Sequence, residues 1–170
     1  MTQTSNTTAL LFVEPLLQTW AMNADYGKQL VEDLEPSQMV AQPHEGMNHP
    51  AWLLSHMNLY AGLLASLLSD ESPADPIDHP FGMKSSPSPD PSVYASKAEL
   101  VDAWVASHER VSMALQRCGE ELLMKPMPIE RFRGRFATVG SCLVYIMSRH
   151  ESLHLGQLSA WRRAIGLPRV

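Results

Sequence analysis

The chain has 170 residues, of which 45% are hydrophobic and 18% are charged, with a formal net charge of -5. This length fits a single domain over residues 1–170, and the apolar fraction supports a packed core and excludes a disordered chain. The negative charge argues against a nucleic-acid partner, because phosphate backbones bind clustered lysine and arginine.

Membrane segments and disulfides are not expected either. No apolar run approaches the roughly 18 residues that a membrane helix needs, so we expect no membrane partner. The first residues lack the charged and apolar regions of a signal peptide, so we expect a cytoplasmic protein. The cysteines, Cys118 and Cys142, form no CxxC motif, and we expect both to be reduced core residues.

The first segment with helical periodicity carries apolar residues at three- and four-residue spacing from Val13 to Leu34. We expect it to end before Pro36, because the residue that precedes a proline avoids helical angles. Its start remains open between two arrangements. Pro15 could occupy the first turn, or a helix that begins near Thr8 could kink at this proline.

A second helix is predicted from about Pro50 to Leu68. Asn48 is a suitable N-cap, and Pro50 falls in the first turn, where a missing N–H has no helical partner to lose. The apolar stripe of this helix passes through His56, and Trp52 and Tyr60 lie one turn away on either side.

A proline- and serine-rich segment follows at about residues 70–95, with six prolines and five serines between Ser72 and Ser92. It is too long and too rich in proline for a tight turn. One interpretation is a long crossover along a bundle, which lets the second and third helices run in the same direction. The other is a disordered surface loop.

The second half of the chain predicts two more helices. One begins at a capping box formed by Ser96 and Glu99 and ends at Gly119. The other is capped by Thr138 and runs to Ile165. Because no segment alternates as a strand would, we predict an all-α fold, a four-helix bundle.

Three of the seven histidines carry the candidate chemistry. His150 and His154 stand four residues apart, which places both imidazoles on one helix face, on a stripe that we expect to include Leu153. His56 adds a third imidazole from another helix, and metal sites in bundles are built from such facing side chains. The alternative is that each histidine is a core residue bonded to a backbone carbonyl.

The two segments that contain these histidines resemble signatures of the DinB-like superfamily. Residues 48–57, NHPAWLLSHM, are similar to its second-helix signature, and residues 150–158, HESLHLGQL, are similar to its fourth-helix signature. Residues 166–168, GLP, are similar to its usual ending. The resemblance implies a four-helix bundle in up-down-down-up order, often a homodimer, with a divalent metal on a histidine triad made of His56, His150 and His154. Relatives include thiol-dependent transferases and isomerases.

The run 150–154, HESLH, also matches the HExxH motif of zinc metalloproteases, in which the glutamate is the general base. The longer metzincin form of the motif fails, because Gln157 and Ala160 stand where it requires glycine and histidine. Glu151 lies about 100° around the helix from its histidine neighbour. It could be a catalytic general base beside a metal, or a solvated charge near Arg149.

Two further features have alternative interpretations. His108 falls on the apolar stripe of the third helix, where it could be a hydrogen-bonded core residue, a group that orients a metal ligand, or a fourth ligand. The segment Arg131–Arg135, RFRGR, could be a plain loop or a clamp for a substrate carboxylate, since arginine suits bidentate contact. Three arginines in an acidic chain are a weak indication of nucleic-acid binding.

From these residues we expect a metal-dependent enzyme that uses a thiol or a water molecule as the nucleophile on a small-molecule substrate. Imidazole ligands suit zinc, nickel and iron alike, and three neutral imidazoles leave a coordination position open for a low-molecular-weight thiol. The alternative is a non-catalytic dimeric module that binds metal or ligand, and a metalloprotease is the third hypothesis.

Overall fold

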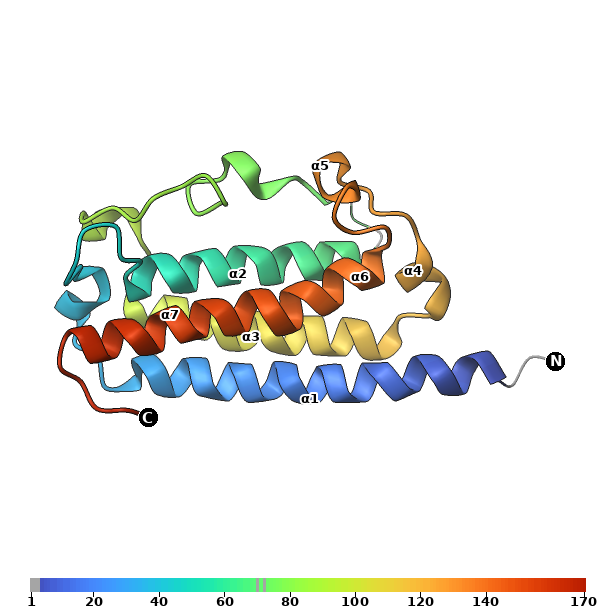
Figure 1. Ribbon diagram of the computed structural model, residues 1–170, viewed down its shortest axis with the longest axis horizontal. Coiled ribbons are helices and arrows are strands. Elements are labelled where there is room, and N and C mark those ends of the chain that lie inside the picture. The colour runs from blue at the N-terminus through green and yellow to red at the C-terminus, as the bar shows by residue number, and fades with distance from the viewer. Residues whose placement is uncertain (1–3, 70, 72) are drawn as a thin grey trace.

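The computed structural model describes residues 4–69, 71 and 73–170 (Figure 1). The first three residues and the beginning of the proline-rich segment, at positions 70 and 72, lie outside the described residues. The helices in chain order are α1 (Thr4–Glu32), α2 (Pro50–Leu67), α3 (Lys97–Arg117), α4 (Glu120–Met124), α5 (Glu130–Arg133), α6 (Val139–Val144) and α7 (Glu151–Ala164).

Shorter turns complete the described secondary structure. A π-helical turn (Tyr145–His150) joins α6 to α7, and 3₁₀ turns lie at Pro36–Val40, Pro76–Asp78 and Pro91–Val93. Within the described ranges there is no β-strand, and one isolated bridge pairs Pro126 with Thr138. The all-α prediction is therefore confirmed. No helix among the described residues combines the length and the hydropathy that a membrane crossing requires.

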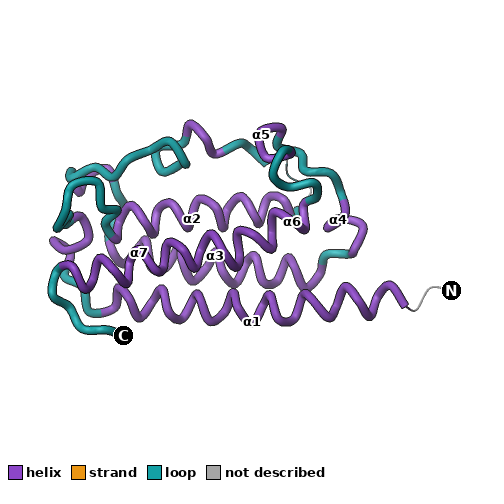
Figure 2. Tube along the Cα trace, viewed as in Figure 1, coloured by secondary structure: helices purple, strands orange, loops and turns teal. Residues whose placement is uncertain are grey.

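Four long rods lie side by side: α1, α2, α3, and the continuous run of α6 and α7 (Figure 1). In this view α2 and α3 run in the same direction, and α1 and the α6–α7 rod run in the opposite one. The chain between α2 and α3 passes back along the length of the bundle as an extended loop with short turns (Figure 2). This segment is thus a crossover over α2.

Aromatic ring nitrogens on α2 and at its N-cap hold the crossover in place. They make three hydrogen bonds to it: His49 Nε2 to the Ser88 carbonyl (2.9 Å), Trp52 Nε1 to Ser85 Oγ (3.0 Å), and His56 Nδ1 to the Phe81 carbonyl (2.7 Å). Because these donors recur along one face of the helix, the crossover lies against that face. It therefore forms a wall beside the candidate histidine site.

The helix caps agree with the sequence at two positions and differ at one. Ser96 forms the predicted capping box at the start of α3, and Thr138 caps α6. Asn48 is not the N-cap of α2, as we had expected. That position belongs to His49, whose Nδ1 accepts the backbone N–H of Trp52 (3.2 Å), so a ring nitrogen takes the place of an amide oxygen.

Two helix ends also differ from the sequence pattern. The helix α1 runs through Pro15 from a start at Thr4, so the proline does not mark its first turn. The helix α3 ends at Arg117, because the residues after Cys118 turn to begin α4, where Gly119 is the N-cap. Neither difference changes the helix on which we expected each candidate histidine to lie.

The core consists of two apolar clusters that stack along the bundle. One contains Trp20, Tyr60, Val111 and Met147, and the other contains Leu30, Trp52, Trp104 and Leu155. On each rod, polar side chains fall between the members of the two clusters. We call this set the polar layer, and it contains Asn23, His56, His108, His150, Glu151 and His154.

Candidate metal centre

Three histidines of the polar layer meet at one point. His150 Nε2 lies 3.2 Å from His56 Nε2 and 3.3 Å from His154 Nε2. Their candidate ligand atoms all lie within 4.8 Å of one another, and no other group of three or more such residues occurs in the described part of the chain. The expectation that these histidines come together is correct.

Two of the three imidazoles are oriented by a partner at the opposite ring nitrogen. The Nδ1–H of His56 donates to the carbonyl oxygen of Phe81 (2.7 Å), and the Nδ1 of His154 lies 3.0 Å from Gln157 Oε1. The amide N–H of Asn48 donates to the same Gln157 oxygen (3.3 Å). This second hydrogen bond keeps the oxygen, rather than the NH₂ group, of Gln157 directed at His154. With their protons at Nδ1, both rings present the Nε2 lone pair to the centre of the triad.

Burial keeps these rings neutral. It lowers the pKa of His56 to about 4 and that of His150 to about 3, and the neighbouring histidines contribute in the same direction. Burial also lowers the pKa of His154. At neutral pH the triad therefore offers lone pairs, and not positive charges, to a ligand.

The close contacts fit a shared cation. His150 Nε2 can carry one hydrogen at most, so it can donate to His56 or to His154, but not to both. One of the two short contacts then leaves two lone pairs facing each other, which is unfavourable without a positive charge between them. Tetrahedral bonds of roughly 2.0–2.1 Å would hold ligand nitrogens about 3.3 Å apart, close to the separations of 3.2 and 3.3 Å.

The triad forms part of the wall of a cavity with a volume of about 370 Å³. The crossover contributes Met83, and the chain before α6 contributes arginine and phenylalanine side chains. The full lining is Trp52, His56, Tyr60, Met83, Arg131, Phe132, Arg135, Phe136, Tyr145, Ile146, His150 and His154. This volume suits a small molecule, and the wall combines aromatic surface with a few polar groups.

The structure places Glu151 neither in solvent nor in the lining of the triad cavity. The residue is only 2% exposed, so it is not a solvated charge. It does not line the triad cavity, and its Oε1 lies 3.0 Å from His108 Nε2 while its Oε2 accepts from Asn23 Nδ2 (3.1 Å). The rotation of about 100° per residue turns this carboxylate towards α1 and α3. Burial raises its pKa, and the hydrogen bond to His108 opposes that rise.

The structure also bears on three related expectations. His108 is a core histidine whose Nδ1–H donates to the Trp104 carbonyl (2.8 Å), and its ring stacks on Trp20 at 4.0 Å. In the HExxH hypothesis Glu151 would be the general base, but it faces His108 and does not line the triad cavity. Leu153 is 55% exposed, so it lies outside the buried stripe on which we had placed it.

Part of the site was missed by sequence reasoning. The π-helical turn precedes Glu151, and such turns often occur at functional sites. It carries Tyr145, Ile146 and His150, which all line the cavity. No sequence pattern indicated this turn. The sequence did indicate Gln157 as a possible partner of His154, because it stands three residues later on the same helix face.

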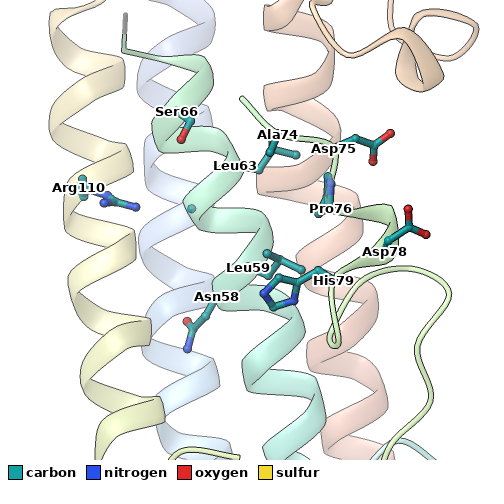
Figure 3. Close-up of a pocket in the computed structure, with 11 residues that line it drawn as sticks. Asn58, Leu59, Leu63, Ser66, Ala74, Asp75, Pro76, Asp78, His79 and Arg110 are labelled. Carbon is teal, nitrogen blue, oxygen red and sulfur yellow. The ribbon is translucent and has the colours of Figure 1, made fainter. Parts of the chain in front are cut away.

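A second pocket of about 520 Å³ lies on the outer side of α2, between α3 and the crossover (Figure 3). Its carboxylates are already paired: Asp75 with Arg131 at 2.6 Å, and Asp78 with Lys84 at 3.8 Å. Figure 3 shows both carboxylates directed away from α2. Although this pocket is larger, it brings no set of metal ligands together, so we place the functional site at the triad.

Comparisons with known proteins agree with this fold. A family model described as the DinB superfamily matches residues 21–158, a range that includes all three histidines. The crystal structure of a conserved protein from Enterococcus faecalis is similar with a TM-score of 0.73 and 19% identity, over 91% of this chain and 96% of that chain. That likeness shows the fold alone. No curated protein matches the sequence. The extent of the family match shows that the chain belongs to the DinB superfamily.

Proposed function

We propose that this protein is a metal-dependent enzyme that acts on a small molecule with a thiol or a water molecule as the nucleophile. The observation that carries the proposal is the convergence of three neutral imidazole nitrogens at the wall of a cavity of about 370 Å³. A divalent ion on His56, His150 and His154 would supply Lewis acidity and lower the pKa of a thiol or water in the cavity.

The protein's own side chains prepare the site. Phe81 and Gln157 orient two of the imidazoles before any ligand arrives. Trp52 stacks on His56 with ring centroids 4.7 Å apart, which restricts the movement of that ring. Phe132 and Phe136 provide apolar wall that can hold the hydrocarbon part of a small substrate and exclude water.

The nucleophile has to come from solution. Neither Cys118 nor Cys142 lines the cavity. Cys142 is fully buried in the core, and burial raises the pKa of its thiol to about 12, so it is protonated at neutral pH. A low-molecular-weight thiol that enters the cavity would fill the role that no cysteine of the chain can.

The open cavity favours an enzyme over a non-catalytic binding module. In a module that only stores or senses metal, we would expect an apolar lid to cover the ion. Here the cavity carries the polar groups of Tyr60, Tyr145 and Arg135 beside the triad. Polar groups around an open position are what substrate binding and orientation require.

Metal content tests the first part of the proposal. After purification without chelator, elemental analysis should find about one divalent ion per chain. His56→Ala, His150→Ala and His154→Ala should each lose most of it, because each removes one ligand of three. The matched control is His108→Gln, which changes another buried histidine of the polar layer, and circular dichroism checks that each variant is folded. Full metal content in the triad variants would place the ion elsewhere.

Cobalt substitution tests the nucleophile. Glutathione or cysteine added to the cobalt protein should produce a sulfur-to-cobalt charge-transfer band that is absent in His56→Ala. If no thiol changes the spectrum at millimolar concentration while the histidine variants still lose cobalt, the metal site stands. Water would then replace the thiol as the proposed nucleophile.

We also propose a homodimer, which the family resemblance implies. Exposed apolar side chains at Phe12, Met124 and Val144 support a surface that a second copy could cover. Sedimentation at micromolar concentration should give about twice the chain mass of 18.9 kDa. A single species at the chain mass would contradict this proposal.

A further inference from the structure

The segment 131–135 brings three arginines to the neighbourhood of the cavity, and two of them are already engaged. Arg131 contacts the carboxylate of Asp75 through Nε (2.8 Å) and Nη2 (2.6 Å), so its charge is matched by an acidic partner. Arg133 donates to the backbone carbonyls of Met127 (2.9 Å) and Pro128 (3.0 Å), and it does not line the cavity. Neither guanidinium is available as an anion site.

Arg135 differs from both. Its Nη2 donates to the hydroxyl of Tyr145 (2.9 Å), and its guanidinium carbon lies 4.3 Å from the centre of that ring. Among the residues that the structure describes, no carboxylate lies within ion-pair distance of it. Contact with Tyr145 holds the guanidinium at the cavity wall and leaves most of its N–H donors for another acceptor.

The cavity has the electrostatic character of an anion site. No aspartate or glutamate is among its lining residues, so no carboxylate of the wall opposes an anion there. Arg135 and His150 line the same cavity, so the guanidinium charge faces the space beside the triad. A divalent ion at the triad would add positive charge on the same side.

We propose that Arg135 selects substrates with a carboxylate group, which its guanidinium holds while the rings of Trp52, Phe132 and Phe136 contact the apolar remainder. The inference rests on the proposed function, since it names the substrate class of the same cavity. It assigns a specificity role to one arginine of the segment, and it gives Arg131 and Arg133 structural roles. An arginine paired with a carboxylate forms charge-assisted and often bidentate hydrogen bonds.

Calorimetric titration with two probes of matched shape tests the inference. Phenylacetate carries the carboxylate, and phenylacetamide is its neutral counterpart. We expect metal-loaded wild-type protein to bind phenylacetate about tenfold more tightly than phenylacetamide, and Arg135→Gln to remove that preference. The matched control is Arg149→Gln, whose guanidinium lies 5.7 Å from the same Tyr145 ring but outside the cavity lining. This variant should keep the preference.

Several results would overturn the inference. One is that wild-type protein binds both probes equally, or binds neither at millimolar concentration. Another is that Arg135→Gln keeps the carboxylate preference, which would assign that preference to the metal. Metal content is measured on the same samples. A protein that holds its metal but lacks the preference contradicts this inference alone, whereas loss of the triad's metal binding contradicts the proposed function. A carboxylate preference in protein without metal would support Arg135 independently.

Discussion

The polar layer contains two histidine clusters that satisfy their buried nitrogens in different ways. His150 and Glu151 are neighbours in sequence, but their side chains face different sides of the α6–α7 rod. On one side His150 meets two other imidazoles, with no carboxylate in the group. On the other side Glu151 faces His108. Asn23 donates to the Glu151 carboxylate, and His108 Nδ1–H donates to a backbone carbonyl.

The difference distinguishes the candidate metal site from a cluster in which the histidine has an acidic partner. His108 donates from Nδ1 to a carbonyl, and its Nε2 faces Glu151 Oε1 at 3.0 Å, so this ring has an acidic partner within ion-pair distance. The triad cannot be satisfied in this way, because at most one of its two short contacts can be a hydrogen bond. The buried imidazole of His108 thus has an acidic partner, whereas the triad has the arrangement that could hold a shared cation.

The largest expected effect is the loss of the acidic partner. Glu151→Ala should lower the free energy of unfolding by about 3 kcal/mol, because it leaves buried His108 without its partner. Glu151→Gln should have a smaller effect, since an amide N–H can donate to His108 Nε2. Urea unfolding measures both. Metal content should stay unchanged in the two variants, and loss of metal with unchanged stability would instead return Glu151 to the metal site.

A smaller effect for each residue is expected from acid on the metal-free triad. The pKa of His56 is about 4 in the folded protein, below its usual value of 6.5, so between these values the unfolded state binds the proton and the folded state does not. The stability is therefore complete above about pH 6.5 and falls as the pH decreases. For His56 the loss at pH 5 should be roughly 2 kcal/mol. Urea unfolding at pH 7 and pH 5 measures it.

The matched comparison for this pH effect is His56→Gln. This variant should lose less stability between pH 7 and pH 5 than wild-type protein, because one of the titrating groups is absent. An equal loss in both proteins would show that groups outside the triad carry the acid sensitivity. Added zinc should reduce the loss in wild-type protein, since the ion competes with protons for the same nitrogens.

The smallest expected effect concerns the orientation of His154. Gln157→Leu removes the acceptor at His154 Nδ1 and should weaken metal binding about tenfold, the lower end of the range for groups that orient a metal ligand. Competition with a zinc-sensitive dye measures the affinity. Gln116→Ala, on an exposed part of α3, is the control. Equal affinity in Gln157→Leu and wild-type protein would show that packing alone orients this ring.

Much of this protein follows from local sequence patterns. Periodicity and capping residues such as Ser96 and Thr138 predicted the helices, because these signals act within a few residues of chain. The four-residue spacing of His150 and His154, with His56 on an apolar stripe, predicted the triad for the same reason. Family resemblance pointed to the same residues and implied the order of the bundle.

Only the tertiary structure decided which polar residues have partners. Buried Glu151 faces His108, which lies on another helix, and buried Arg162 pairs with Asp33, the residue that follows α1. The cavity wall is likewise assembled from the crossover and the segment before α6. In the same way, Arg131 has an acidic partner and Arg135 has none among the described residues. Each of these pairings joins residues far apart in the chain, and periodicity reports only which face of its own helix a residue occupies.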